Sequence, residues 1–198
     1  MRRALVGAVM ALGALGDLGL IAQTERVASP AGSSATQVGG RYDPRAGYVG
    51  GKWIEIRYGR PIKRGRDLFG PPDFAEALAD GAPVWRAGAN VSTRLLTEAP
   101  LAIGGKTIAP GEYTVFIDVK RDDWTLIIST WAAQLKGYDT NDKSALFGAY
   151  DYTPDKDVVR APMTLEVLPR SFDQLSWGFL DVSETGGRLA LLWDRQLA

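Results

Sequence analysis

The chain of 198 residues contains no histidine and no cysteine. Catalysis by a serine–histidine or cysteine–histidine pair is therefore excluded, and so is a zinc site built from imidazole or thiolate ligands. No disulfide can form, so the folded chain depends on its core alone. We expect no cofactor and no metal site.

Other motifs of catalysis and ligand binding are incomplete. No serine stands three residues before a lysine, the spacing that serine–lysine catalysis would normally show. Gly105-Lys106-Thr107 lacks the earlier glycine of a phosphate-binding loop. Residues 139–144 begin like a calcium loop but have Ser144 where glycine is needed and Tyr150 at the twelfth position. Both segments are therefore interpreted as ordinary turns or loops.

Paired carboxylates are the remaining route to catalysis, because glycoside hydrolysis needs two acids that face each other across a cleft. Most acidic candidates fall in turns, where aspartate is expected for conformational reasons. Enzyme activity is therefore left open but is not favoured. The candidates are Asp118, Asp122, Asp123, Asp151 and Asp155.

The N-terminus has the pattern of a secretory signal peptide. Two arginines follow Met1, an apolar stretch of small residues covers 4–15, and cleavage is expected after Ala22. Asp17 makes a membrane span unfavourable, because a charge is costly in lipid. We therefore expect residues 1–22 to be removed and the protein to be exported, to the periplasm or outside the cell, with no membrane span after cleavage.

The charges of the chain are balanced, with 23 basic and 23 acidic residues. Removing residues 1–22 takes away Arg2, Arg3 and Asp17 and leaves a net charge near −1. A neutral domain has no bulk attraction for nucleic acid. We therefore expect no nucleic-acid partner, while the oligomeric state stays open.

The pattern along the chain predicts an all-β fold. Residues 23–51 are rich in Gly, Ser, Ala and Pro and are predicted to be largely flexible, with a first strand near 35–38. From residue 52 onward, apolar and polar residues alternate in short runs, of which 52–58 is the clearest. Residues 73–79 are the one expected helix, with Asp73 as N-cap. We predict a single antiparallel β-sandwich domain over 52–198, with about nine short strands and a barrel as the alternative.

The segment from Tyr58 to Asn90 combines cations, aromatic rings and glycines more densely than the rest of the chain. Arginine presents a planar fork that binds carboxylate or phosphate through two hydrogen bonds, and tryptophan adds an aromatic surface with one N–H donor. The alternative is that the arginines brace loops by donating to backbone carbonyls. The candidate ligand-binding residues are Arg60, Lys63, Arg66, Trp85, Arg86 and Asn90.

The order of these motifs resembles the domain-of-unknown-function 2911 family over roughly residues 38–193. The most specific element is the run 85–90, Trp-Arg-Ala-Gly-Ala-Asn. The resemblance implies an exported, mostly bacterial protein and carries no established activity. The other motifs, in chain order, are Tyr58-Gly59-Arg60-Pro61, Lys63, Gly65-Arg66, Phe69-Gly70, Ile103-Gly104-Gly105, Pro110-Gly111, Tyr113 and Trp124-Thr125-Leu126.

Three functions stay open from the sequence. The favoured one is a binding module for a small anionic or carbohydrate ligand that uses the six candidate residues. The second is a structural or assembly domain of the cell envelope, in which the arginine-rich segment braces the fold. The third is a hydrolase or lyase that uses carboxylates, with arginine stabilising charge.

Overall fold

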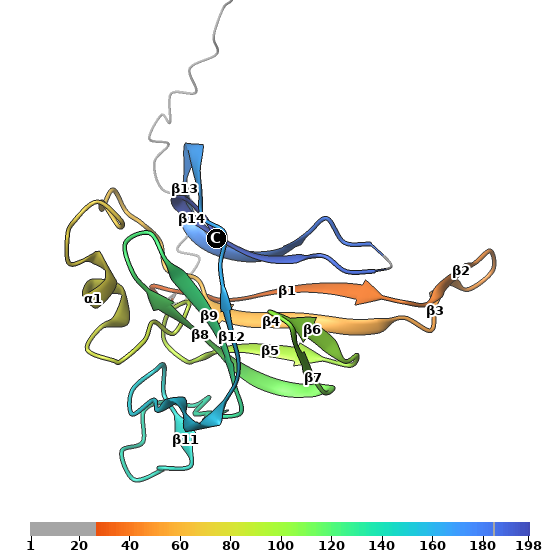
Figure 1. Ribbon diagram of the computed structural model, residues 1–198, viewed down its shortest axis with the longest axis horizontal. Helices are drawn as coiled ribbons and strands as arrows, with labels where there is room; N and C mark the ends of the chain where they lie inside the picture. The colour runs from red at the N-terminus through yellow and green to blue at the C-terminus, as the bar shows by residue number, and fades with distance from the viewer. Residues whose placement is uncertain (1–26, 184) are drawn as a thin grey trace, which may run out of the picture.

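The computed structural model describes residues 27–183 and 185–198. A six-stranded antiparallel sheet forms most of the fold (Figure 1). No closed barrel is found in the described part of the chain, so the all-β prediction is confirmed and the barrel alternative is not. The strand order across the sheet is β1 (Ala31–Val38), β4 (Lys52–Gly59), β5 (Thr93–Thr97), β8 (Gly111–Val119), β9 (Trp124–Ser129) and β12 (Asp157–Pro162).

Strand β4 shows why the sheet has one buried face. Ile54, Ile56 and Tyr58 alternate with polar residues and are all buried, whereas Arg57 is exposed. Because successive side chains of a strand point to opposite faces, this alternation places the apolar residues on the core side. The predicted strand over 52–58 is confirmed.

A second layer covers that face. Strands β13 (Glu166–Leu180) and β14 (Arg188–Leu197) pair antiparallel and form a two-stranded sheet of their own. Leu175, Trp177, Leu191 and Trp193 are buried in the main core, which the six-stranded sheet shares. The two layers form the predicted sandwich.

A smaller apolar cluster lies apart from the main core. Residues 131–156 contribute to it and contain the two-residue strands β10 (Ala132–Ala133) and β11 (Ala145–Leu146), which pair parallel, and the 3-10 turn η1 (Pro154–Lys156). Phe116 and Ile127 supply the sheet residues of this cluster, and both are fully buried. The sheet therefore buries residues on both faces near its β8–β9 pair. The cluster consists of Val84, Phe116, Ile127, Leu146, Ala149 and Tyr152.

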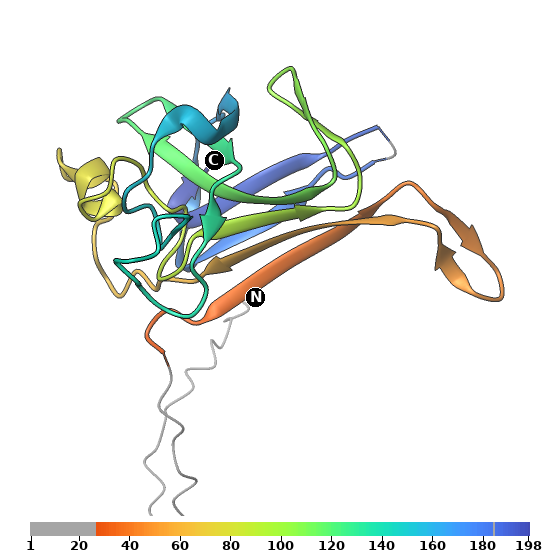
Figure 2. The ribbon, with the colours of Figure 1, turned by 90° about the horizontal axis from the view of Figure 1, so that it is seen from below.

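The segment 23–51 differs from its prediction. Strand β1 pairs with β4 along its whole length, from Ala31 opposite Gly59 to Val38 opposite Lys52. The hairpin of β2 (Arg41–Asp43) and β3 (Gly47–Val49) follows and projects from the body, as Figure 2 shows. The composition of this segment predicted that few apolar side chains would be buried. Strand β1 is nevertheless ordered, because its backbone forms hydrogen bonds with β4 and this pairing does not need apolar side chains of its own. Strand β1 therefore adds residues 31–38 to the edge of the six-stranded sheet, a longer strand than the one expected near 35–38.

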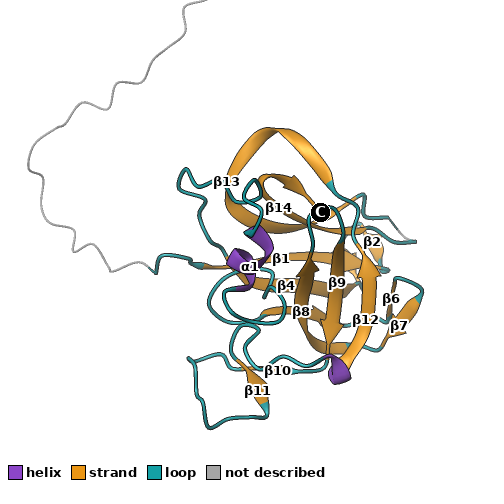
Figure 3. Cartoon of the chain, turned by 60° about the vertical axis from the view of Figure 1, so that its left-hand side comes forward, coloured by secondary structure: helices purple, strands orange, loops and turns teal. Residues whose placement is uncertain are grey.

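The short elements match their predictions more closely. Helix α1 (Phe74–Ala79) lies at one end of the sandwich (Figure 3), and Asp73 occupies its N-cap position without a side-chain capping bond. Strands β6 (Leu101–Ile103) and β7 (Lys106–Ile108) form a hairpin. Gly104 and Gly105 both have positive φ at its turn, as a tight hairpin requires.

The prediction of a signal peptide over 1–22 lies outside the described residues. Within the described part, no helix has the length and apolar character needed to cross a bilayer.

Candidate functional site

The segment 58–90 crosses itself where β4 ends. Gly59 lies so close to Ala89 that a Cβ on the glycine would stand 1.9 Å from the Ala89 carbonyl oxygen. The carbonyl of Ala87 accepts hydrogen bonds from Trp177 Nε1, at 2.9 Å, and from Thr93 Oγ1, at 3.1 Å. This crossing ties the segment to β5 and to the second layer.

Arg86 is buried, with 7% of its surface exposed, and both terminal nitrogens of its guanidinium group donate hydrogen bonds. Nη1 donates to the carbonyl of Asn90 at 3.0 Å, and Nη2 donates to Asp80 Oδ2 at 2.9 Å and to the Tyr150 hydroxyl at 3.3 Å. The group also lies 5.1 Å from the centre of the Tyr150 ring. Arg86 therefore joins three segments of the chain and offers no free fork to a ligand.

Asn90 and Arg66 also donate to backbone carbonyls. Asn90 has positive φ, and its side-chain amide bonds the carbonyl of Ser29 at 2.9 Å. Arg66 Nε donates to the carbonyl of Lys63 at 2.9 Å, and its Nη2 donates to that of Ile62 at 2.8 Å. Both side chains brace loops, which is the alternative that the sequence left open.

Trp85 belongs to the core. Its ring is 2% exposed, stacks on Trp193 with centroids 6.2 Å apart, and meets Trp124 edge to face at 6.1 Å. Its backbone exchanges two hydrogen bonds of 2.9 Å with Ile117. Trp85 anchors its segment to β8 and does not present a surface to solvent.

Arg60 and Lys63 leave the sheet in different surroundings. The aliphatic stem of Arg60 packs where a Cβ on Gly32 would stand, and its buried Nε has no hydrogen-bond partner among the described residues. Lys63 instead donates to Asp194 and, at 3.2 Å, to Ser171 Oγ. None of the six predicted residues lines the hollow around Phe69 described next, but Lys63 bonds Asp194, which does.

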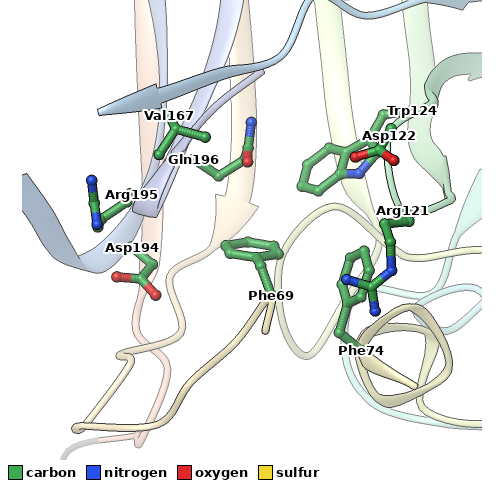
Figure 4. A pocket seen from close by; sticks show the side chains of 9 residues that line it. All are labelled: Phe69, Phe74, Arg121, Asp122, Trp124, Val167, Asp194, Arg195 and Gln196. Atoms are coloured by element: carbon green, nitrogen blue, oxygen red, sulfur yellow. The ribbon is translucent and has the colours of Figure 1, made fainter. Parts of the chain in front are cut away.

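That hollow, which we call the Phe69 hollow, lies between the end of β14 and the β8–β9 turn and has a volume of about 250 Å³. In Figure 4 Phe69 lies in the middle, Asp194 and Arg195 stand on one side, and Arg121 and Trp124 stand on the other. Phe69 is half-buried, and its ring centroid lies 5.6 Å from that of Trp124. Its lining residues are Phe69, Phe74, Arg121, Asp122, Trp124, Val167, Asp194, Arg195 and Gln196.

A lysine, a serine and a carboxylate meet beside the hollow. Asp194 Oδ1 accepts from Lys63 Nζ and from Ser171 Oγ, the latter at 2.7 Å. Burial alone would raise the pKa of Asp194, but the hydrogen bonds from these two donors outweigh it and hold the pKa below its usual value.

The two arginines of the hollow are less occupied than Arg86. Arg121 Nη2 donates to the carbonyl of Pro71 at 3.3 Å, and its guanidinium lies over the Phe74 ring. Arg195 Nε donates to the carbonyl of Leu168 at 2.8 Å. The remaining N–H groups of both side chains have no protein partner within 27–183 and 185–198, and both residues are exposed. They can therefore donate to a guest.

Comparison with known proteins gives one match. Residues 44–198 match the family described as protein of unknown function, DUF2911. The chain belongs to the DUF2911 family. No curated protein and no solved structure matches. The DUF2911 match includes both the Arg86 contacts and the Phe69 hollow, whereas β1 lies outside it.

The carboxylates named from the sequence are scattered over the DUF2911 domain. Asp118 pairs with Arg160 at 3.1 Å, and Asp151 pairs with Lys143 at 3.0 Å. Asp122 lines the Phe69 hollow together with Asp194, which the sequence did not single out. Because the pKa of Asp194 is lowered, this carboxyl cannot supply the proton that a general acid must donate.

Sequence reasoning missed Ser171, Asp194, Arg195 and Arg121. Arg121 and Asp122 lie in the turn between β8 and β9, and Asp194 and Arg195 lie in β14. The contact of Lys63 with Asp194 joins residues 131 positions apart, so no local spacing could have indicated it. A serine–lysine contact does exist, but it links the loop after β4 to the inside of β13 rather than residues of one helical turn.

Proposed function

We propose that this DUF2911 protein is an exported binding domain that holds a small acidic or polyhydroxylated ligand in the Phe69 hollow. The observation that carries the proposal is the placement of two arginines, Arg121 and Arg195, on opposite sides of one aromatic floor. Each guanidinium retains donors that no protein group uses within the described residues.

The lining holds two arginines and two carboxylates, Asp122 and Asp194, and so suits a guest that carries both an acidic group and hydroxyl groups. Free guanidinium N–H groups bind carboxylate through strong, charge-assisted hydrogen bonds. The half-buried ring of Phe69 offers an apolar surface against which a ligand can exclude water. A volume of about 250 Å³ suits a molecule the size of a sugar or a small organic acid rather than a polymer segment.

The six residues predicted from the sequence take two roles in this proposal. Lys63 supports the ligand site by holding Asp194. The other five position the segment that carries Phe69. We further propose that the protein acts in the periplasm or outside the cell, which rests on the signal pattern of residues 1–22 and the absence of cysteine.

A thermal-shift and calorimetric screen tests the proposal. The parent protein should be stabilised by one or more small carboxylates or sugar acids, because a ligand that binds only the folded state raises its stability by mass action. Arg121→Ala and Arg195→Ala should each weaken binding about tenfold or more. Arg41→Ala is the matched control, because this exposed arginine lies in the β2–β3 hairpin and does not line the hollow. No stabilisation of the parent by any member of the screen would refute the proposal.

A purely structural role in the cell envelope is the second candidate. It is favoured by one observation: the donors of Arg66, Arg86 and Asn90 go largely to backbone carbonyls. This candidate predicts that Arg86→Ala lowers the melting temperature, whereas Arg121→Ala and Arg195→Ala alter no measurable property. It is rejected if either of the latter variants loses a ligand that the parent binds.

A further inference from the structure

We infer that Asp194 is the residue of the Phe69 hollow that accepts a ligand hydroxyl group, so that the hollow selects a hydroxylated ring acid of the uronic-acid type. The inference rests on the proposed function and names the substrate class for the same site. It depends on the backbone of Asp194, on which of its oxygens is free, and on the charges around it.

The backbone holds Asp194 in a conformation that a strand does not ordinarily contain. Its φ is +51°, although it lies within β14. It stands opposite Phe172, between two points where the register of β13 and β14 shifts. Aspartate and asparagine tolerate this left-handed region better than most residues.

The two oxygens of the carboxylate have different surroundings. Oδ1 accepts both hydrogen bonds, from Lys63 and Ser171. Oδ2 has no hydrogen-bond partner in the parts of the chain that the structure describes, although the residue is 92% buried, with 8% of its surface exposed, and lines the hollow. Oδ2 itself is not among the buried unpartnered atoms, so it is accessible from the hollow. A ligand group there can donate a hydrogen bond to it.

The neighbouring charges favour a hydroxyl over an ammonium as that donor. Lys63 contacts the same carboxylate, and Arg195 is the next residue along β14. The charge of Asp194 is already paired with Lys63, and Asp122, the other carboxylate of the lining, stands on the opposite side of Phe69 (Figure 4). A cationic ligand group at Oδ2 would therefore meet two cations, whereas a neutral hydroxyl would not be repelled. Because the lowered pKa keeps Asp194 ionised at neutral pH, the carboxylate acts there as an acceptor only.

The remaining features of the hollow suit the rest of such a ligand. Arg121 and Arg195 provide donors for a carboxylate. Phe69 provides an apolar ring surface, against which the C–H face of a sugar ring can pack. A ring that carries both hydroxyl groups and one carboxylate uses all three features together.

Three probes of similar size test the inference by calorimetry: glucuronate, which has the carboxylate and the hydroxyls; cyclohexanecarboxylate, which lacks the hydroxyls; and glucose, which lacks the charge. The parent should bind glucuronate about tenfold or more tightly than either of the others. In Asp194→Asn, the amide would present a donor where Oδ2 accepts, and asparagine fits the left-handed backbone. The preference for glucuronate over cyclohexanecarboxylate should then fall to within about twofold.

Asp181→Asn is the matched control. Asp181 also has positive φ, at +52°, and pairs with Arg188, and it does not line the hollow. This variant should keep the preference of the parent for glucuronate.

The outcomes separate the two levels of the proposal. If the parent binds none of the probes and no other small acid, the proposed function is refuted, and this inference with it. Equal affinities of the parent for glucuronate and cyclohexanecarboxylate refute the hydroxyl selection while leaving anion binding intact, and that result needs no variant to fold. A preference that persists in folded Asp194→Asn shows that another group accepts the hydroxyl.

Discussion

The Arg86 contacts and the Phe69 hollow are two uses of the same kind of side chain in one molecule. At Arg86, the guanidinium is buried and its Nη donors meet a carbonyl, a carboxylate and a hydroxyl. At the hollow, Arg121 and Arg195 each donate one hydrogen bond to a backbone carbonyl, and their other N–H groups have no partner among the described residues. The comparison teaches that an arginine in a glycine-rich segment indicates a ligand site only when the folded chain leaves its donors unused.

The difference has a physical cause in what lies beside each side chain. Arg86 is surrounded by three segments, which carry Asp80, Asn90 and Tyr150, and each supplies an acceptor. The hollow lies where the β8–β9 turn and β14 stand apart on either side of Phe69 (Figure 4). Fewer acceptors reach the guanidinium groups there.

The largest loss of stability is expected from a substitution at the crossing of Gly59 and Ala89, which supports the Arg86 contacts. Gly59→Ala would place a methyl group 1.9 Å from the backbone oxygen of Ala89, which cannot move without displacing the segment. We expect a loss of about 3 kcal/mol or more in the free energy of unfolding, measured by urea denaturation. Gly178→Ala is the control, because nothing lies within 4 Å of its added Cβ. Equal stability of the two variants would contradict the close approach.

The next largest loss of stability is expected when the buried guanidinium group of Arg86 is removed. Arg86→Ala leaves the Asn90 carbonyl and the space beside Tyr150 without their partner. We expect a destabilisation of about 2 to 3 kcal/mol. Arg66→Ala should cost clearly less, since Arg66 is exposed. If Arg86→Ala unfolds at the same denaturant concentration as the parent, the bracing role is wrong.

A smaller effect is expected beside the hollow, where Lys63 pairs with Asp194. Lys63→Ala leaves Asp194 charged, mostly buried and bonded only to Ser171. We expect a destabilisation of about 1 to 2 kcal/mol. The matched variant Lys143→Ala removes an exposed lysine from an exposed pair with Asp151 and should be close to neutral. Equal stability of both variants would show that the Lys63 contact is no stronger than a surface ion pair.

The smallest effect is a dependence on pH. The pKa of Asp194 is lowered in the folded chain, so its stabilisation is present above the unfolded value of about 4 and is lost as pH falls through the folded value. The stability difference between the parent and Asp194→Asn should therefore shrink below about pH 4. Urea unfolding at a series of pH values measures this, and a difference that stays constant down to pH 3 would contradict it.

Local pattern predicted the elements better than it predicted the site. The alternation of Ile54, Ile56 and Tyr58 and the glycine pair at 104–105 were sufficient for a strand and a hairpin. Only the last residues of strand β1 were predicted, because its small polar residues become a strand through backbone pairing with β4 and carry no apolar alternation of their own. Trp85 and Arg86 were rightly singled out as unusual, but their burial was not readable from the chain.

By itself the sequence determined the all-β class, the DUF2911 family and the exclusion of histidine and cysteine chemistry, since these follow from residue identity, short-range alternation and motif order. Only the tertiary structure decided which cations are occupied. That decision depends on acceptors contributed from far along the chain, such as Asp194 for Lys63 and Tyr150 for Arg86. A hydrogen bond needs its two atoms about 3 Å apart, and the separation of two residues in sequence does not fix that distance.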